Sequence, residues 1–518
     1  MSKKDFQIPV IEKEKFTFVK EGVKISDQKF EDKPIGYFKD AWLRFRKNKA
    51  SIFAAIIILF IVLFAIFAPL FNTRYDSNFL DPYYAKMGPR NMTLSKIGIA
   101  QGTRERNFNI RGFILAQAIG VGSMGYDGET VSFDKIDATM NPIKEITAES
   151  ENAFTGEPTY TAKIDTYLEV GFMYTQIEQH EFAEIRKFEE ETGIRVLFPL
   201  IAENEFYHDT QNANYWYKAD AKLNPLDENG RRIDYSDDMQ LVDNYMRDEN
   251  GNLVYNVYTG GGDFDTAQYR VRVLYYNFYQ YENGFEPEYL FGTDSQGYDL
   301  ALRMAVGLRL SLLLSVCVFL INFVLGAMYG AVEGYYGGTV DLIMERVSDI
   351  LAGVPFIVVA TLFQMHLAQK LGVIPSLIFA FVVTGWIGTA SRVRTQFYRF
   401  KSAEYVMAAR TLGAKDRRII WKHIFPNALG TIITSSVLSI PGVIFSESML
   451  SFLGIVNLGG SDMTSLGTLL SDASSIWTIY PHLMIFPAIV ISLLMICFNL
   501  FGNGLRDAFN PSLRGTEE

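Results

Sequence analysis

An uncharged run, 50-ASIFAAIIILFIVLFAIFAPL-70, limits the folds that are open to this chain. A helix needs about 20 consecutive apolar residues to cross the hydrocarbon of a bilayer, and this run has that length. Similar runs follow near 310–330, 350–367, 374–390, 428–446 and 483–501. The mean hydropathy of the chain is nevertheless only +0.08, because a polar stretch separates the first run from the others. The runs predict an all-α polytopic membrane protein with six transmembrane helices and one large insert.

The distribution of basic residues predicts how the chain is oriented. The sequence 44-RFRKNK-49 directly precedes the first run, residues 391–427 are rich in Lys and Arg, and 452–482 contain neither. Lys and Arg are enriched in the cytoplasmic loops of membrane proteins. We therefore expect both termini and the 391–427 loop in the cytoplasm. The insert, in which acidic residues outnumber basic ones, then lies outside the cell.

The insert is rich in Tyr and Phe, which favours a folded domain over a disordered linker. The sequence 178-EQHEFAEIRKFEEETGI-194 has helical character and lies between two apolar stretches, 166–175 and 195–201, that are predicted to be strands. Further strands with glycine turns are expected at 230–235, 250–263 and 270–280. The pattern predicts an α+β domain.

Three short patterns in the insert are weak signals for a ligand. The string 120-GVGSMG-125 fits a dinucleotide-binding fingerprint, but turn and strand residues follow it where a helix would have to begin. We therefore expect a glycine hairpin there. His180 and Glu181 lack the second histidine of a zinc protease, which favours a solvated helix face. Asp263 and Asp265 lie beside three glycines and leave a calcium site as a minor alternative.

A few polar and kinking residues fall in or near the apolar runs. Pro355 and Pro441 would kink the helices that contain them. Asp341, Glu345 and Asp349 recur every four residues on one helix face, beside Arg346, and are expected to be solvated or ion-paired. Glu447 is an isolated acid in an apolar run, so it is a candidate pathway residue, although a hydrogen bond to a neighbouring helix explains it equally well. The residue pattern contains no catalytic or metal-binding constellation.

The stretch 404-EYVMAARTLGAKDRRIIWKHIFPN-427 lies between two apolar runs. Ser402 is a suitable cap for a helix that starts near Glu404, and Gly413 is a suitable residue to end it. Asp416 is a suitable cap for a second helix that leads toward Pro426. The sequence thus predicts a short helix held away from the membrane by a glycine bend, a shape that fits a groove in a partner protein.

This stretch resembles the EAA loop of ABC importer permeases, E-A-A-x3-G-x9-I-x-L-P. Ala408, Ala409, Gly413 and Pro426 fall in register with that motif. Met407, His423 and Phe425 stand where the motif has Glu, Ile and Leu.

Four other stretches are similar to the C-type subunit of oligopeptide and dipeptide permeases: 291-FGTDSQGYDLALRMAVGLRLSL-312, 330-GAVEGYYGGTVDLIMERVSDILAGVP-355, 447-ESMLSFLG-454 and 498-FNLFGNGLRDAFNPSLR-514. Tyr298, Asn503 and Asn510 depart from the family pattern. The resemblance covers 34–76 and 290–514, and the insert has no counterpart in it. It implies a type I ABC importer permease fold. The expected parts are a cytoplasmic tail and amphipathic helix over 1–49, a first transmembrane helix over 50–71, an extracellular insert over 72–290, a five-helix permease core over 291–505 with the coupling loop 391–427, and a C-terminal tail over 506–518.

The resemblance implies a function in the bacterial cell membrane. The chain would be one permease subunit of an ATP-driven importer of oligopeptides or dipeptides. It would pair with a second permease subunit, two cytoplasmic ATP-binding subunits and an extracellular solute-binding protein. The coupling residues would be Glu404, Tyr405, Ala408, Ala409, Arg410, Leu412, Gly413 and Pro426. The gate or pathway candidates are Asp294, Asp299, Pro355, Pro441 and Glu447.

The sequence contains no G-x-x-x-x-G-K-[ST] string, so we expect no enzymatic activity and no cofactor in this chain, with ATP and Mg²⁺ bound by partner subunits. Nickel or another small solute remains an alternative cargo for the same family. A membrane receptor would need a cytoplasmic output domain, and a membrane enzyme would need a reactive constellation. The sequence offers neither, and nothing in it indicates nucleic-acid binding.

Overall fold

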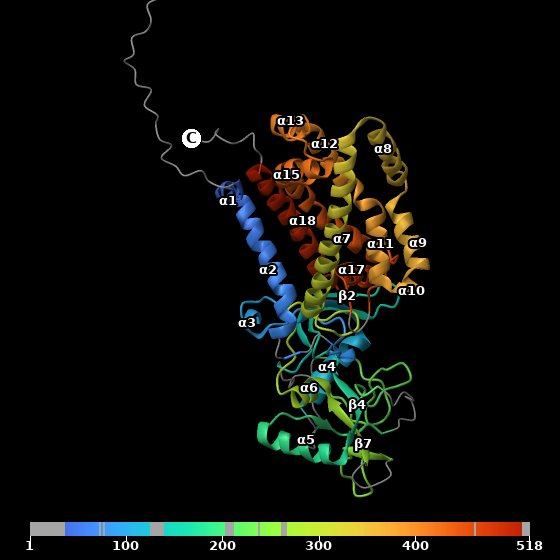
Figure 1. The fold of residues 1–518 in the computed structure, drawn as a ribbon. Coiled ribbons are helices and arrows are strands. Elements are labelled where there is room, and N and C mark those ends of the chain that lie inside the picture. The colour runs from blue at the N-terminus through green and yellow to red at the C-terminus, as the bar shows by residue number, and fades with distance from the viewer. Residues whose placement is uncertain are drawn as a thin grey trace, which may run out of the picture.

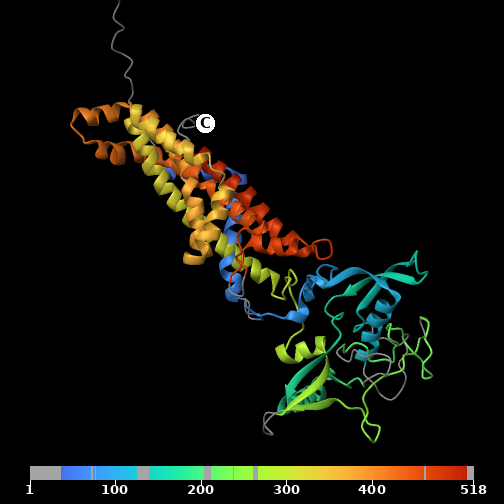
Figure 2. The same ribbon diagram turned by 90° about the vertical axis from the view of Figure 1, so that its right-hand side faces the viewer.

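The computed structural model describes residues 37–71, 74–75, 78–124, 139–202, 212–236, 239–260, 267–459 and 463–509. These residues form an elongated helical bundle with a separate α+β body at one end (Figure 1). The view turned by 90° shows the same two parts joined by a narrow neck (Figure 2). Asp263 and Asp265, the candidate calcium ligands, lie outside the described residues.

The bundle has five helical segments that are long and apolar enough to cross a membrane, or six if one bent helix pair is counted as a span. This confirms the predicted polytopic membrane fold. The five segments are α2 (Lys49–Phe71), α7 (Leu300–Tyr336), α11 with α12 (Val373–Gly385, Ile387–Phe400), the run Asp416–Phe452 that ends in α15 and α16 (Phe425–Val437, Ser439–Phe452), and α18 (His482–Phe509). The bent pair is α8 (Gly338–Ala352) and α9 (Phe356–His366), whose axes meet at 71°. Pro355 immediately precedes α9, so it lies at the break rather than inside a helix.

The N-terminal amphipathic segment forms its own helix, α1 (Tyr37–Lys47), before α2 begins at Lys49. Phe45 is buried and meets the ring of Phe501 on α18 edge-on, with ring centroids 5.5 Å apart. Trp42 lies on the outer face and is 58% exposed. The helix therefore packs one apolar side against the end of α18 instead of continuing the first span.

Small residues bring α7 and α12 into close contact. Gly326, Gly330 and Gly334 recur every four residues on α7 and face α12. A Cβ atom at Gly330 would lie 2.1 Å from the carbonyl oxygen of Ala390, so a larger residue cannot be accommodated without separating the two helices. Glycines at this spacing let membrane helices approach until their backbones touch.

The described residues of the insert form two antiparallel sheets. The first has the strand order β1 (Thr103–Asn109), β3 (Pro158–Asp165), β2 (Ile143–Glu151). The second has the order β4 (Phe172–Glu178), β7 (Gln268–Leu274), β5 (Leu197–Phe198), with β6 (Asn256–Gly260) also paired to β7. The main helices are α4 (Ile110–Ser123), α5 (Gln179–Thr192) and α6 (Tyr275–Asn283).

The glycine hairpin predicted at 120–125 is wrong for residues 120–124, the part of this stretch that the structure describes. Gly120 and Gly122 lie in the second half of α4. A Cβ atom at Gly122 would lie 2.7 Å from Nε1 of Trp216, so the glycine lets the helix pack against that ring. A dinucleotide site would need a helix to begin at these glycines, whereas α4 begins ten residues earlier at Ile110.

Three strand predictions also need correction. Residues 166–171 form no strand, and the strand begins at Phe172. Residues 230–235 contain only an isolated bridge at Arg232. The run 270–280 is a strand only up to Leu274, after which α6 begins. Tyr275, Tyr276, Phe278 and Tyr279 are all buried in α6, so packing in the core overrides the strand preference of aromatic residues.

The neck, formed by residues 74–75 and 78–84 after α2 and by residues 289–299 before α7, joins the insert to the bundle. Both a ring stack and a close backbone contact hold it together. Tyr75 stacks on Tyr289 with ring centroids 4.6 Å apart. Gly297 has a φ of +109°, and a Cβ atom there would lie 1.9 Å from the carbonyl oxygen of Asp81. Only glycine fits at this position, because both the φ value and the space exclude a side chain.

Candidate functional site

The loop that resembles the EAA motif lies at the end of the bundle opposite the insert (Figure 1). Its first arm is α13 (Glu404–Thr411), and its second arm starts with α14 (Asp416–Arg418). Gly413 lies between the arms with a φ of +80°, the left-handed conformation that glycine adopts without strain. A bend at this glycine was predicted, and the structure has it.

Two predicted helix caps are wrong. The residue before α13 is Ala403, and no side chain caps the helix, so Ser402 does not serve as the cap. Asp416 is the first residue of α14 rather than its cap. Its carboxylate is directed elsewhere: Oδ1 accepts a hydrogen bond of 2.5 Å from the hydroxyl of Tyr335.

The first arm presents most of the predicted coupling residues to the outside. Leu412 is 88% exposed, and the other exposed members are Glu404, Tyr405, Ala408, Arg410 and Gly413. Ala409 is half-buried. Val406 is fully buried, and it anchors the arm in an apolar cluster with Ile419, Ile420 and Ile424 of the second arm. The sequence analysis did not predict a role for Val406. A β-branched apolar residue in a helix with mostly exposed neighbours was the one indication that it is buried.

The second arm continues into the span without a loop. Residues Ile419–Ile424 form one turn of π-helix (η5) between α14 and α15. Pro426, which is exposed, lies in the first turn of α15. Proline has no amide hydrogen for the helix ladder, and π turns occur where that ladder is interrupted. The second arm is therefore the beginning of the apolar helical segment Asp416–Phe452.

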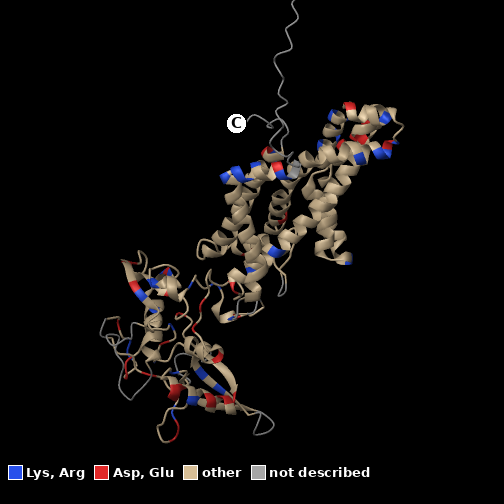
Figure 3. Ribbon diagram, turned by 60° about the vertical axis from the view of Figure 1, so that its left-hand side comes forward, with Lys and Arg blue, Asp and Glu red and all other residues tan. Residues whose placement is uncertain are grey.

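A shallow groove runs beside the second arm. Its volume is about 670 Å³, and Trp421 and Pro426 form part of its wall. The other lining residues are basic: Lys415, Arg417, Arg418 and Lys422. Lys and Arg gather at this end of the molecule, while the middle of the bundle carries few charged residues (Figure 3). The groove is suited to acidic side chains of a partner protein.

Tyr335, at the end of α7, contacts both arms. In addition to its bond to Asp416, its hydroxyl accepts a hydrogen bond of 3.4 Å from Nη2 of Arg410 on the first arm. Neither Tyr335 nor its role was predicted, because a tyrosine among the glycines of 330–338 carries no signal of its own.

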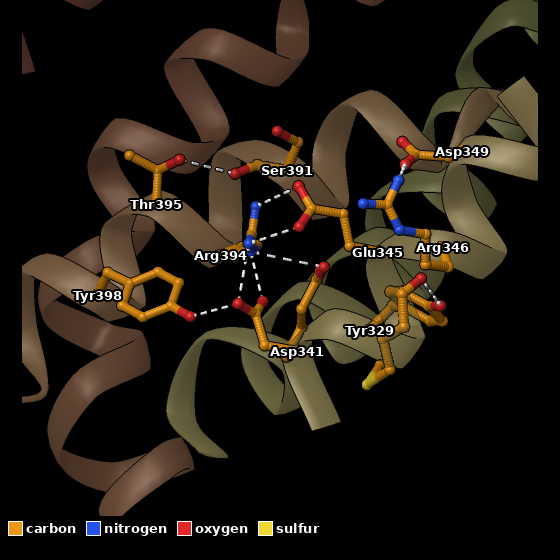
Figure 4. Close-up of polar contacts among 11 residues, drawn as sticks. Tyr329, Asp341, Glu345, Arg346, Asp349, Ser391, Arg394, Thr395 and Tyr398 are labelled. Atoms are coloured by element: carbon orange, nitrogen blue, oxygen red, sulfur yellow. Dashed lines mark hydrogen bonds and ion pairs between the residues drawn. The ribbon is translucent and has the colours of Figure 1, made fainter. Parts of the chain in front are cut away.

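Arg394 on α12 bonds to Asp341 and Glu345 (Figure 4) and lies close to a third acidic residue, Glu333. Its Nε and Nη2 donate to the Asp341 carboxylate at 2.6 and 2.9 Å, and its Nη1 and Nη2 donate to Glu345 at 2.9 and 3.0 Å. Glu333 lies 3.5 Å from Nε. The hydroxyl of Tyr398 donates to Asp341 at 2.6 Å. An ion-paired acidic face was expected on α8, and its main cation is Arg394 from another helix.

This cluster, Arg394 with Glu333, Asp341 and Glu345, ties α8 to α7 and α12. Arg346, the cation that is close in sequence, pairs instead with Asp349 at 3.2 Å, and both of these side chains are largely exposed. None of the residues of α8 is buried in this chain. Polar contacts from Arg394 and Tyr398 therefore contribute much of its attachment.

Asp294 and Asp299 form a compact turn before α7. The Oδ1 atom of Asp294 accepts hydrogen bonds from the amides of Gln296, Gly297 and Tyr298 at 2.9–3.0 Å. Asp299 caps α7 by accepting from Ala301 and Leu302. Burial raises the pKa of the Asp294 carboxyl above its ordinary value and raises the pKa of Asp299 to about 6. Their visible role is to hold the neck on the bundle.

Glu447 is fully buried on α16, and Pro441 is buried on the same helix. Oε2 of Glu447 accepts a 2.8 Å hydrogen bond from Ser311 on α7, and Oε1 accepts from Ser451 at 3.1 Å. Within the described residues no ion pair or hydrogen bond joins Glu447 to Asp294 or Asp299. The gate candidates thus occupy separate places rather than one site.

Comparisons with known proteins identify the family of the chain. Residues 322–515 match the family "Binding-protein-dependent transport system inner membrane component", and residues 36–89 match "N-terminal TM domain of oligopeptide transport permease C". The chain therefore belongs to the family of inner-membrane permeases of binding-protein-dependent ABC transport systems. Such subunits work in a complex with other transporter subunits, and they are not the ATPases.

Within that family the chain is similar to the OppC and DppC permeases. It is 41% identical over 228 residues to the oligopeptide transport system permease protein OppC of Bacillus subtilis, which covers 44% of this chain and 73% of that protein. It is 43% identical over 229 residues to the dipeptide permease DppC of the same organism, covering 44% and 70%. For OppC of Escherichia coli K12 the identity is 38% over 231 residues, covering 44% and 74%.

Proposed function

We propose that this chain is a permease subunit of an ATP-driven importer of oligopeptides or dipeptides. The peptide cargo is supported by the names of the relatives with which the chain shares 38–43% of aligned residues. The proposed complex contains a second permease subunit, two cytoplasmic ATP-binding subunits and an extracellular solute-binding protein. ATP and Mg²⁺ would be bound by the ATP-binding subunits.

The geometry of the coupling loop carries the proposal. One arm is open to the outside along the residues that match the EAA motif, while buried Val406 fixes it to the other arm. A cleft in an ATP-binding subunit would receive the exposed face of α13. Acidic residues at the rim of that cleft would meet the basic groove formed by Lys415, Arg417, Arg418 and Lys422.

Transmission follows from the way the second arm ends. A push on α13 would reach the second arm through the packing of Val406 against Ile419, Ile420 and Ile424, and the π turn would carry it on into α15. Tyr335 connects the same push to α7. ATPase closure would thereby move two spans together and change which side of the membrane the pathway opens to.

Cysteine crosslinking tests the docking. With Cys317 and Cys497 replaced by Ser, Leu412→Cys should crosslink to an ATP-binding subunit in membranes, and the yield should change when nucleotide is added. Leu80→Cys, which is also exposed but lies at the neck, is the matched control and should not crosslink to it. If no position along 404–413 captures a nucleotide-hydrolysing neighbour, the coupling role is wrong.

The insert is proposed to lie outside the cell, where it would dock the solute-binding protein or shape the entrance of the pathway. This is supported by its position at the end of the bundle opposite the coupling loop (Figure 1). Removing residues 80–285 and measuring the association of the binding protein tests the idea. Unchanged association together with unchanged uptake would exclude it. No observation in the described residues favours nickel or another small solute as cargo.

A further inference from the structure

A cavity of about 300 Å³ lies where the insert meets the segment that leads into α18. Its polar lining contains three basic residues, Lys86, Arg104 and Arg106, and one acidic residue, Glu169. Tyr480 contributes the wall on the side of the bundle. The cavity therefore lies between the insert and the segment of the bundle that precedes α18.

The charges around the cavity do not balance. Glu169 pairs with both Arg104, at 3.3 Å, and Arg106. No carboxylate lies within ion-pair distance of Lys86 in the described part of the chain. Arg104 has a buried Nε–H that meets no hydrogen-bond acceptor among the described residues. Burial and the neighbouring charge of Arg104 lower the pKa of Arg106, as expected where like charges are crowded.

Two of the cations, Lys86 and Arg104, make cation–π contacts with the ring of Tyr480. The guanidinium carbon of Arg104 is 4.8 Å from the centroid of Tyr480, and Nζ of Lys86 is 5.9 Å from it. Tyr480 precedes the span α18 by two residues. Tyrosines are enriched at this level, where apolar spans meet the headgroups of the lipids.

The backbone holds Lys86 in an unusual conformation. Its φ is +63°, a value that residues other than glycine rarely adopt. Its amide donates to the carbonyl of Asp294 at 2.9 Å, which fixes the segment against the neck. A strained residue whose side chain carries an unpaired charge into a cavity is typical of a ligand site.

We propose that this cavity binds the phosphate of an anionic phospholipid headgroup. Guanidinium groups match phosphate oxygens in pairs, and the negative charge of one phosphodiester would offset part of the surplus positive charge. Tyr480, just before α18, places the cavity at the level of the lipid headgroups. The lipid would clamp the insert onto the outer end of α18. Free phosphate has the same chemistry, so the test must separate the two.

The test measures lipid retention by the full chain, copurified with its transporter subunits. The chain is reconstituted into nanodiscs that contain equal amounts of phosphatidylglycerol and phosphatidylcholine. Native mass spectrometry should then show that it retains several-fold more phosphatidylglycerol than phosphatidylcholine. The double variant Arg104→Gln/Arg106→Gln should lose this preference. Lys86→Gly should lose much of it while melting no lower than the wild type, because glycine relieves the positive φ. Lys187→Gln/Lys222→Gln removes two exposed charges elsewhere in the insert and should change nothing.

Three results would overturn the proposal. The first is equal retention of both lipids by the wild-type chain, and the second is undiminished preference in the Arg104→Gln/Arg106→Gln and Lys86→Gly variants. The third is protection against thermal unfolding by millimolar inorganic phosphate without any preference for phosphatidylglycerol, which would make the ligand a soluble anion. Release of phosphatidylglycerol, but not of phosphatidylcholine, from the wild-type chain on addition of inorganic phosphate would support the site.

Discussion

The hydroxyl of Tyr335 donates a 2.5 Å hydrogen bond to the carboxylate of Asp416, and this bond joins the end of α7 to the second arm of the coupling loop. Arg410 on the first arm reaches the same hydroxyl at 3.4 Å. One side chain thus connects both arms of the loop to a span that carries the neck of the insert at its other end. The two ends of the molecule are linked through a single helix, α7.

Tyr335→Phe should weaken coupling without unfolding the chain. The variant removes both hydrogen bonds but keeps the ring, and a bond to a charged group contributes about 1.5–3 kcal/mol. We expect uptake per ATP hydrolysed to fall several-fold in reconstituted vesicles. Tyr336→Phe is the control, since that neighbouring side chain is 53% exposed. Equal coupling in both variants would show that the Tyr335 hydroxyl has no part in transmission.

Arg394→Lys should lower the melting temperature even though it keeps the positive charge. A lysine cannot reproduce the paired bonds to Asp341 and Glu345, because its single ammonium group lacks the planar set of donors of a guanidinium. Because Arg394 is partly exposed, we expect a loss of about 1–2 kcal/mol, less than for a fully buried pair. Arg346→Lys alters only the exposed pair with Asp349 and should stay within about 0.5 kcal/mol. Similar losses in both variants would contradict a special role for Arg394.

Much of the bundle was predictable from the sequence, and much of the polar site was not. Apolar length identified the spans, and a glycine at the end of a helical pattern located the bend at Gly413, because both are local properties. The partner of Asp341 is Arg394, 53 residues away, and no local pattern reveals such a contact. The same applies to α4. Its glycines predicted a turn, but in the structure Gly122 lies in a helix and makes room for the ring of Trp216 from a distant segment.

Gly413→Pro should abolish transport while the chain still inserts into the membrane. The φ of Gly413 is +80°, and proline is restricted to about −65°, so the bend between the arms cannot form. Gly413→Ala is the graded control. No atom lies within 4 Å of the added Cβ, so only backbone strain of about 1 kcal/mol opposes it. Ala409→Glu, on the half-buried face of α13, should also stop uptake and ATPase coupling. Normal uptake by the Gly413→Pro or Ala409→Glu variant would count against a coupling helix.

Glu447→Gln should be tolerated far better than Glu447→Leu. Glutamine keeps an oxygen that accepts from Ser311 or Ser451, whereas leucine leaves both buried hydroxyls without their acceptor, at about 1–3 kcal/mol. Thermal unfolding in detergent measures the difference, and Ser446→Ala on the same helix serves as a control. If uptake is lost in Glu447→Gln while its melting temperature is unchanged, the carboxylate has a role in transport beyond holding α16 to α7.

Asp299 should make the stability of the neck depend on pH. Burial raises its pKa from 3.8 to about 6, so the folded state favours the protonated carboxyl. The resulting stability is fully present below pH 3.8 and is lost as the pH rises through 6, which amounts to about 3 kcal/mol. Asp299→Asn keeps a side-chain cap for α7 but cannot titrate. The melting temperature of the wild type relative to this variant should therefore fall between pH 4 and pH 7 and stay constant above pH 7. A constant difference across that whole range would show that the Asp299 carboxylate is better solvated, or better paired, than its burial implies.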